Sequence, residues 1–121
     1  MSPAIQRDDV GARGRVLLSR EFASHGYACG STSFLVVGGE VDFEAVHRFT
    51  RALDAAAGSA PTLVVLDTAE LTFIDSQGLG AIGSARDGLR AHCGDLVIRN
   101  ASVMLTRLLE IVGLTTLLEA V

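Results

Sequence analysis

The segment from Thr62 to Cys93 joins a buried strand to a helix, and it constrains the fold more than any other part of the sequence. It begins with the continuous apolar run Leu63-Val64-Val65-Leu66, which is typical of a strand buried on both faces of a sheet. The run ends at Asp67. A second apolar pair, Phe73-Ile74, leads directly into Asp75-Ser76, after which apolar residues recur with a helical period. The segment therefore predicts a strand that feeds the N-terminus of a helix.

Asp75 and Ser76 are both suited to cap this helix, because a short side-chain oxygen accepts a hydrogen bond from a free amide of the first turn. The same amides and the helix dipole favour an anion, so they would partly compensate a phosphate on Ser76. Two interpretations of Ser76 follow, an ordinary cap or a regulatory phosphorylation site, and the local sequence alone leaves both open.

The expected helix has one apolar side and one nearly bare side. Leu79, Ile82, Leu89 and Cys93 fall on the apolar side, where Cys93 is expected to be buried as a small hydrophobic residue. The opposite side carries Ser76, Gly80, Gly83, Ser84 and Asp87. Each glycine in a helix interior costs up to ~1 kcal/mol relative to alanine. A reason to give up this stability would be the close approach of another backbone to Ser76.

The sequence around this junction resembles the signature of the STAS domain, the family of anti-sigma-factor antagonists and sulfate-transporter tails. The matching residues are Ile74-Asp75-Ser76-Gln77-Gly78-Leu79-Gly80, preceded by Val64-Val65-Leu66-Asp67 and Phe73. A second specific match is the Gly113-Leu114 end of Leu109-Glu110-Ile111-Val112-Gly113-Leu114. The segment Gly38-Gly39-Glu40-Val41-Asp42 also resembles the family's turn into its first helix. The resemblance covers about Ser33 to Leu118. In the family, the serine after the aspartate is the phosphorylation site.

Other segments alternate between strand and helix patterns. Candidate strands are 16–18, 22–28, a clear apolar strand at 34–37 that Gly38-Gly39 would close, and 96–98. One helix is expected after a cap at Asp42, and residues 58–61 would end it; its buried residues would be Val46, Phe49, Leu53 and Ala56. A second helix is expected after Ser102, and Gly113 would end it; its buried residues would be Leu105, Leu108, Leu109 and Val112. Residues 114–121 fit either a short helix or an edge strand.

This order predicts the α/β class. We expect a single-domain STAS-like sandwich with a mixed, mostly parallel sheet of four to five strands and helices mainly on one face. Residues 1–14 are expected to form a flexible N-terminal arm, and 15–121 the STAS-like domain.

Composition narrows the classes of function. A chain of 121 residues that is 49% hydrophobic is expected to fold as one domain. The net charge of -4 argues against a direct nucleic-acid partner, and no apolar run approaches the ~20 residues of a membrane span, so a cytoplasmic location is expected. Two distant cysteines, Cys29 and Cys93, form no disulfide framework or metal motif, although they remain a candidate redox pair.

The family resemblance implies a binding module controlled by phosphorylation. The unphosphorylated protein would bind an anti-sigma factor and free its sigma factor. That partner, a serine kinase, would phosphorylate Ser76 and abolish binding, and a PP2C-type phosphatase would reverse the modification. The expected partner-binding residues are Asp42, Asp75, Ser76, Gln77, Gly78, Gly80, Gly83, Ser84 and Asp87.

Two alternatives stay open. The first is a constitutive STAS scaffold subunit of a transporter or sensor complex, in which Ser76 only caps the helix. The second is an enzyme, but the chain has no GxxxxGK[ST], GxGxxG, HExxH or GxSxG motif, and His25, His47 and His92 are scattered. We therefore expect no catalytic residue, metal or cofactor.

Overall fold

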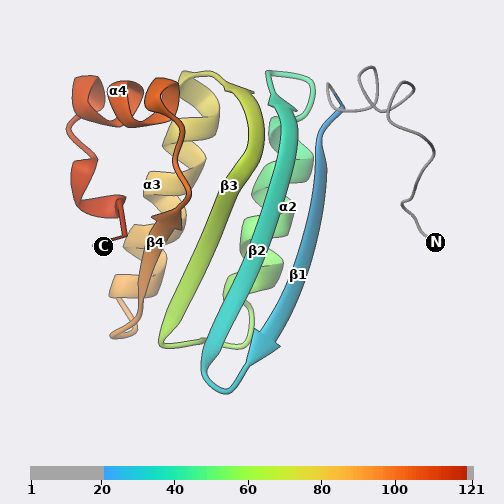
Figure 1. The fold of residues 1–121 in the computed structure, drawn as a ribbon. Coiled ribbons are helices and arrows are strands. Elements are labelled where there is room, and N and C mark those ends of the chain that lie inside the picture. Colours follow the sequence, from blue (N-terminus) through green and yellow to red (C-terminus); the bar gives the residue numbers. More distant parts are fainter. Residues whose placement is uncertain (1–20, 120–121) are drawn as a thin grey trace.

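In the part of the chain that the structure describes, four strands form one mixed sheet in the order β1-β2-β3-β4 (Figure 1). The computed structural model describes residues 21–119. Strand β1 (Ala23–Cys29) pairs antiparallel with β2 (Thr32–Val41), whereas β2 pairs parallel with β3 (Leu63–Ile74) and β3 pairs parallel with β4 (Asp95–Arg99). The sheet therefore matches the mixed, mostly parallel α/β fold that the sequence predicts.

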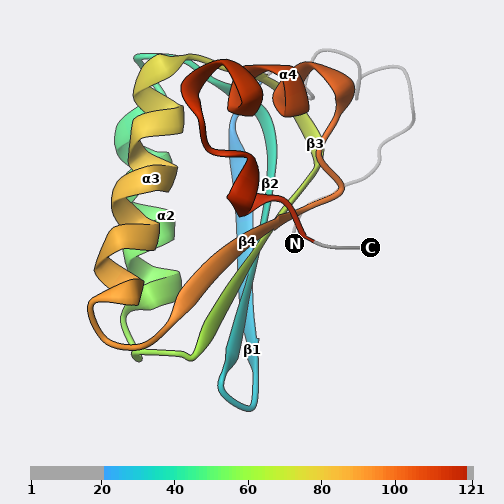
Figure 2. The same cartoon turned by 90° about the vertical axis from the view of Figure 1, so that its left-hand side faces the viewer.

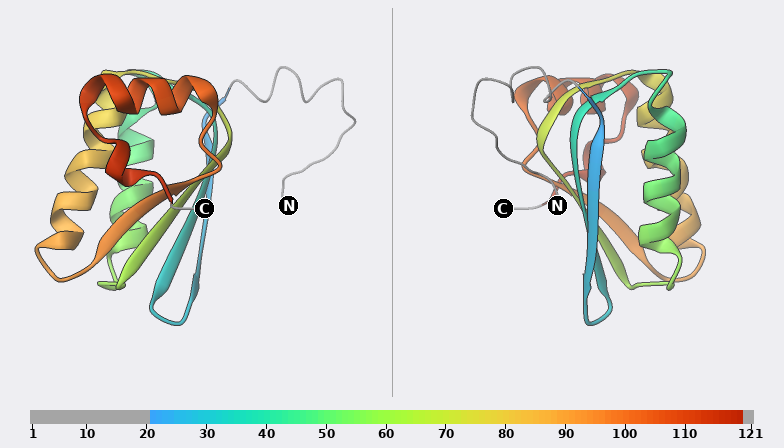
Figure 3. Two further views of the ribbon diagram at one scale, coloured as in Figure 1. Left: turned by 60° about the vertical axis from the view of Figure 1, so that its left-hand side comes forward. Right: turned by 90° about the vertical axis from the view of Figure 1, so that its right-hand side faces the viewer.

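Helices α2 (Val46–Ala57) and α3 (Ser76–Arg90) pack side by side on one face of the sheet (Figure 2). Helix α4 (Val103–Val112) runs across the end at which β4 finishes, and the 3-10 helix η1 (Thr115–Leu117) follows it (Figure 3). In the described part of the chain, no helix covers the opposite face of the sheet. The carboxyl ends of the parallel strands and the N-termini of α2 and α3 consequently meet at the same end of the molecule.

Residues alternate between the two faces of β2. Leu35, Val37, Gly39 and Val41 are buried on the side of the helices, while Val36, Gly38 and Glu40 between them are only half-buried. Phe49 and Leu53 of α2 and Ile82 of α3 complete this layer of the core. Burial of the helix-facing side of the sheet is thus what holds α2 and α3 in place.

Strands β2 and β3 are both longer than the sequence predicts. Strand β2 continues through Gly38-Gly39 to Val41, with irregular register between Val36 and Glu40. At Gly39, φ is 80° and a Cβ would collide with the carbonyl oxygen of Glu21, so only glycine fits. Strand β3 likewise does not end at Asp67 but runs unbroken to Ile74.

The predicted helices are present, with shifts at their ends. Helix α2 begins at Val46, later than the expected cap at Asp42. Helix α4 begins after its cap Ser102 and ends at Gly113, which is left-handed (φ 76°), as predicted. The chain after α4 forms η1 and then one bridge from Leu118 to Ile98, so neither expectation for 114–121 was complete.

Three expectations need a further note. The candidate strand at 22–28 is β1, whereas the candidate strand at 16–18 and the arm at 1–14 lie outside the described residues. The expectation that Cys93 is buried on the apolar side of the helix is wrong, because α3 ends at Arg90 and Cys93 lies exposed in the following loop with φ 66°. Within residues 21–119, every helix is too short or too polar to cross a bilayer.

Candidate functional site

The junction between β3 and α3 is a helix cap made by Asp75. Its Oδ1 accepts hydrogen bonds from the backbone N–H groups of Gln77 and Gly78, both at 3.1 Å, while the residue itself stays extended. Ser76 is the first residue of α3, is exposed, and makes no side-chain hydrogen bond within the described residues. Because Asp75 accepts from the Gln77 and Gly78 amides, the cap is made by Asp75, and the Ser76 hydroxyl makes no capping hydrogen bond and stays exposed.

Asp42 lies next to this junction. The N–H of Asp75 donates to the carbonyl oxygen of Val41 at 3.2 Å, which fixes the end of β3 beside the end of β2. Asp42 then caps the turn that precedes α2, because its Oδ1 accepts from the N–H groups of Glu44 (3.1 Å) and Ala45 (3.0 Å). Two turns capped by carboxylates therefore stand side by side, as expected for strand ends at one edge of a parallel sheet.

Gly78 does not belong to the exposed surface predicted for it. The residue is buried in the first turn of α3, and a Cβ there would lie 2.5 Å from Cγ1 of Ile74 and 3.0 Å from Cγ1 of Val41. Glycine is needed because the helix begins directly against the ends of two strands. Gly78 therefore positions Ser76 from beneath and offers no contact to a partner.

The remaining predicted residues of α3 do share one outer face. Ser76, Gln77, Gly80, Ser84 and Asp87 are exposed, and Gly83 is half-buried. A Cβ at Gly80 would meet no atom within 4 Å, and at Gly83 it would meet only the Leu114 side chain, at 3.8 Å. We call these six residues the α3 face. Its glycines expose helix backbone to anything that docks beside Ser76.

Exposed apolar side chains lie in the turn after Asp42 and at the end of α4, and the sequence pattern did not predict their exposure. Phe43, in the turn after Asp42, is 70% exposed, and Ile111 at the end of α4 is 79% exposed. Val112, predicted to be buried, is 47% exposed because α4 extends beyond the sheet. The sequence feature that could have predicted an exposed Phe43 is its place directly after the capping residue Asp42, in a turn before a helix.

A buried arginine was also missed. Arg86 is only 7% exposed; its Nε donates to Oδ1 of Asp95 at 3.0 Å and its Nη1 to Oγ1 of Thr116 at 2.6 Å. Arg90 also donates to both oxygens of Asp95, at 3.2 Å each. Hydrogen bonding from Arg90, with a smaller contribution from Arg86, lowers the pKa of the Asp95 carboxyl to about 2. These groups join α3 to β4 and η1, away from Ser76.

The histidines and cysteines do not gather into a site. His25 lies on β1, His47 on α2 and His92 in the loop after α3, and residues 21–119 contain no group of three side chains placed to hold a metal ion. Cys29 and Cys93 are free and exposed at opposite edges of the sheet. Three strand spacings of ~4.8 Å place those edges ~14 Å apart, farther than the Cα separation of any disulfide. The candidate redox pair therefore does not form within one chain.

Known proteins resemble this chain in both sequence and fold. The family model described as "Mlab, STAS domain" matches residues 28–119. An anti-sigma-B factor antagonist of Listeria monocytogenes is 32% identical over 85 residues, which is 70% of this chain and 75% of that protein. The Listeria innocua protein of the same name matches equally well.

Two solved structures extend the comparison to the fold. An anti-sigma factor antagonist from Mycobacterium paratuberculosis gives a TM-score of 0.73 at 19% identity and covers 82% of this chain and 84% of its own. The anti-sigma factor antagonist SpoIIAA in its unphosphorylated form gives 0.70 at 23% identity, covering 82% and 86%. At these identities the structures establish a shared fold. The sequence matches confirm the resemblance that was predicted from the Asp75-Ser76 signature.

Proposed function

Because the chain belongs to the STAS-domain family, we propose that it acts as an anti-sigma factor antagonist whose binding is controlled at Ser76. The observation that carries this proposal is the position of Ser76. It is exposed at the start of α3, makes no capping hydrogen bond, and belongs to the glycine-rich α3 face, while Phe43 is exposed in the neighbouring turn after Val41 and Asp42. In its unphosphorylated form the chain binds an anti-sigma factor through the α3 face, with Asp42 and Asp75 at the border, and the sigma factor is released.

Phosphorylation would act as an electrostatic and steric switch at this surface. A phosphate adds about -1.5 to -2 charges at pH 7. At Ser76 it would stand beside the Asp75 carboxylate, which already occupies the Gln77 and Gly78 amides, so those two amides are not free to compensate it. The expectation that first-turn amides partly compensate the phosphate is therefore limited to amides that Asp75 does not occupy. A partner packed on the α3 face would have to desolvate the added charge, and this weakens the complex without a change of fold.

The family resemblance also supplies the proposed enzymes of the cycle. The anti-sigma factor itself is the serine kinase that modifies Ser76, and a PP2C-type phosphatase removes the phosphate. The chain acts as a binding module in the cytoplasm and has no catalytic role of its own, in keeping with the regulatory relatives. Ser76 is the substrate of the kinase, and Asp75 holds the backbone around it.

The test compares Ser76→Ala and Ser76→Glu as parallel baits in source-cell lysate, with mass spectrometry as the readout. We expect Ser76→Ala to retain a kinase-fold anti-sigma factor and Ser76→Glu to lose it. With the purified pair, a loss of ~3 kcal/mol corresponds to binding weakened more than a hundredfold. The matched control is Ser59→Glu, which places the same charge on an exposed serine at the other end of the molecule. Equal binding by both Ser76 variants would overturn the proposed switch.

The same experiment addresses the scaffold alternative. A constitutive subunit of a transporter or sensor complex would be retrieved equally by both baits, because its contacts would not depend on Ser76. Solved relatives by fold include a sulfate transporter family protein from Wolinella succinogenes, with a TM-score of 0.62 at 19% identity, so the fold itself does not decide between the two roles. Dependence on Ser76 is therefore the deciding observation.

A further inference from the structure

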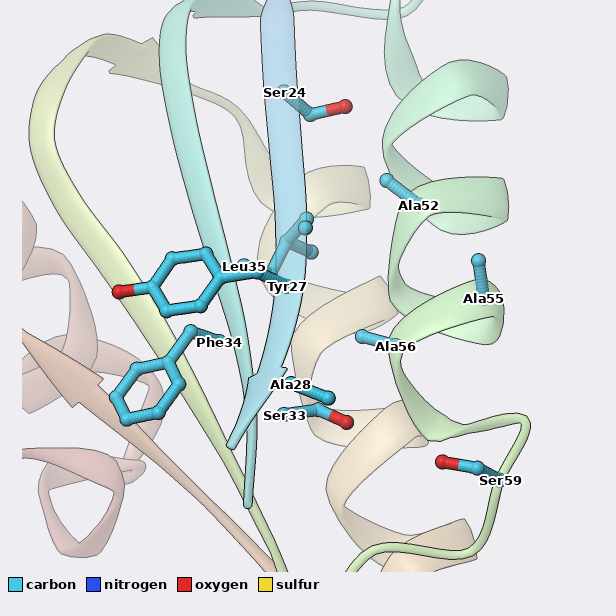
Figure 4. Close-up of a pocket in the computed structure, with 11 residues that line it drawn as sticks. Ser24, Tyr27, Ala28, Ser33, Phe34, Leu35, Ala52, Ala55, Ala56 and Ser59 are labelled. Carbon is cyan, nitrogen blue, oxygen red and sulfur yellow. The ribbon is translucent and has the colours of Figure 1, made fainter. Parts of the chain in front are cut away.

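A groove of about 370 Å³ lies between the edge strand β1 and helix α2, and no residue of α3 lines it (Figure 4). Six of its lining residues have small side chains that point into the space between strand and helix: Ser24, Ala28, Ser33, Ala52, Ala56 and Ser59. The rings of Tyr27 and Phe34 turn to the opposite face of the sheet, so they contribute only backbone to this groove. The volume lies within the ~300–1,000 Å³ range of small-molecule sites.

The groove continues a slot that is filled at its other end. Phe22, just before β1, packs edge-on against Phe49 of α2 with ring centroids 5.9 Å apart, and the Arg48 guanidinium lies 5.4 Å from the Phe22 ring. Farther along β1, the residues on the same side as Phe22 are small, and so are the residues of α2 that oppose them. The space between strand and helix is therefore left open where an apolar side chain would otherwise fill it.

Ser33 gives this hollow a polar feature that packing does not explain. The residue is only 6% exposed, its side chain points into the groove, and its hydroxyl makes no hydrogen bond in the described part of the chain. A buried polar group without a partner is destabilising, because it has lost its hydrogen bonds to water and gained none in return. A bound molecule that offers a hydrogen bond at this position would remove that cost.

We propose that the groove binds a neutral amphiphile, namely an aliphatic chain that carries an uncharged hydroxyl or carbonyl group. The alanines and Leu35 supply the apolar walls, and Ser33 supplies the hydrogen bond at depth. Within residues 21–119, no charged residue lines the groove, so a carboxylate or phosphate headgroup would enter without a compensating cation from this part of the chain. The site is independent of the Ser76 surface and of the function proposed for it.

The test is a titration of the full chain with 1-octanol, followed by amide chemical shifts, with octanoate as the charged probe of equal length. We expect saturable shifts confined to β1, the start of β2 and the second half of α2, and weaker binding of octanoate. Ser33→Ala should weaken octanol binding about fivefold, as expected for one hydrogen bond worth ~1 kcal/mol. Shifts that do not saturate, or that lie elsewhere, would overturn the proposal.

Two matched variants separate groove binding from general hydrophobic adsorption. Ala28→Leu adds an apolar side chain on the groove side of β1 and should abolish octanol binding. His25→Leu adds a similar side chain on the other side of the same strand and should leave binding unchanged. Equal binding by the two variants would contradict the proposal. Contacts from residues 1–20 to Ala52 or Ala56 in the free protein would also contradict it, because the groove would then already be filled by the chain itself.

Discussion

At the scale of single residues, Asp75 caps helix α3 and Ser76 presents an exposed hydroxyl, two roles that the sequence alone did not assign to separate residues. The Asp75 carboxylate holds the first-turn amides of α3 at 3.1 Å, and the Ser76 hydroxyl, one residue later, remains exposed. A modification of Ser76 therefore need not break a capping bond. This separation allows a change of surface charge with little cost to the stability of the domain, as a reversible switch requires.

Phe43 is the residue that we expect to contribute most to partner binding after Ser76. Its side chain is 70% exposed, so Phe43→Ala should change the free energy of unfolding by less than ~0.5 kcal/mol. An aromatic anchor at an interface commonly contributes ~2 kcal/mol or more, so binding to the anti-sigma factor should weaken at least tenfold. Calorimetric titration of the purified pair measures this.

The control for this substitution is Tyr27→Ala. Tyr27 is 50% exposed on the sheet face opposite the helices, where it stacks on Phe34 with ring centroids 4.9 Å apart. We expect no effect of this change on partner binding. If Phe43→Ala bound as tightly as the unchanged protein, the partner surface would not include the turn after β2.

Particular residues show what the sequence can and cannot predict. The cap at Asp75 and the end at Gly113 were predictable because both depend on local backbone chemistry. The burial of Arg86 was missed, although the residue falls on the same helical side as Ile82 and Leu89. Its partner Thr116 lies thirty residues away in sequence, so no local sequence pattern predicts the hydrogen bond that stabilises the buried guanidinium.

At the scale of elements, the exposed glycines of α3 lower the stability of the helix and leave its backbone uncovered. Gly80→Ala and Gly88→Ala should each raise the free energy of unfolding by ~0.5–1 kcal/mol, because neither Cβ would meet an atom within 4 Å. Gly80 lies one turn from Ser76, whereas Gly88 is near the other end of the helix. Only Gly80→Ala should therefore weaken partner binding. Urea unfolding and titration of the two variants measure both effects.

At Gly78, in the same helix, substitution by alanine is expected to destabilise the protein. Gly78→Ala should lower the free energy of unfolding by ~1–3 kcal/mol, because the new Cβ would overlap Ile74 and the helix would have to move. A Gly80→Ala variant that gained stability and kept full affinity would show that the bare face serves no docking function.

Strand lengths illustrate a second limit of sequence patterns. The apolar run of β3 was predicted to end at Asp67, yet the strand continues through a largely polar stretch to Ile74. Pairing with β2 maintains it, since the register continues from Gly38 with Glu70 to Val41 with Ile74. The extension carries the chain to the end of the sheet where α2 and α3 begin. The position of Ser76 thus depends on a pairing between distant segments that periodicity does not encode.

At the scale of the whole molecule, the Asp95 cluster joins the end of α3 to β4 and η1 and should make stability depend on acid pH. The pKa of Asp95 is lowered from 3.8 to about 2, mainly by its hydrogen bonds from Arg90. A lowered folded-state pKa adds stability that is complete above the unfolded value and is lost as pH falls from about 4 to about 2. Because the Asp95 side chain is 38% exposed, screening reduces this contribution to ~1 kcal/mol.

Urea unfolding of the unchanged protein and of Asp95→Asn at pH 6 and pH 2.5 tests this prediction. The difference in unfolding free energy between the two proteins should be larger at pH 6 and should shrink at pH 2.5, because Asp95 of the unfolded chain is then protonated and unfolding takes up a proton. Glu44→Gln removes one exposed carboxylate at the opposite end of the sheet and is the control for the general effect of removing a negative charge. A constant difference across this range would mean that the arginines stabilise the fold by packing and neutral hydrogen bonds, without a contribution from the Asp95 charge.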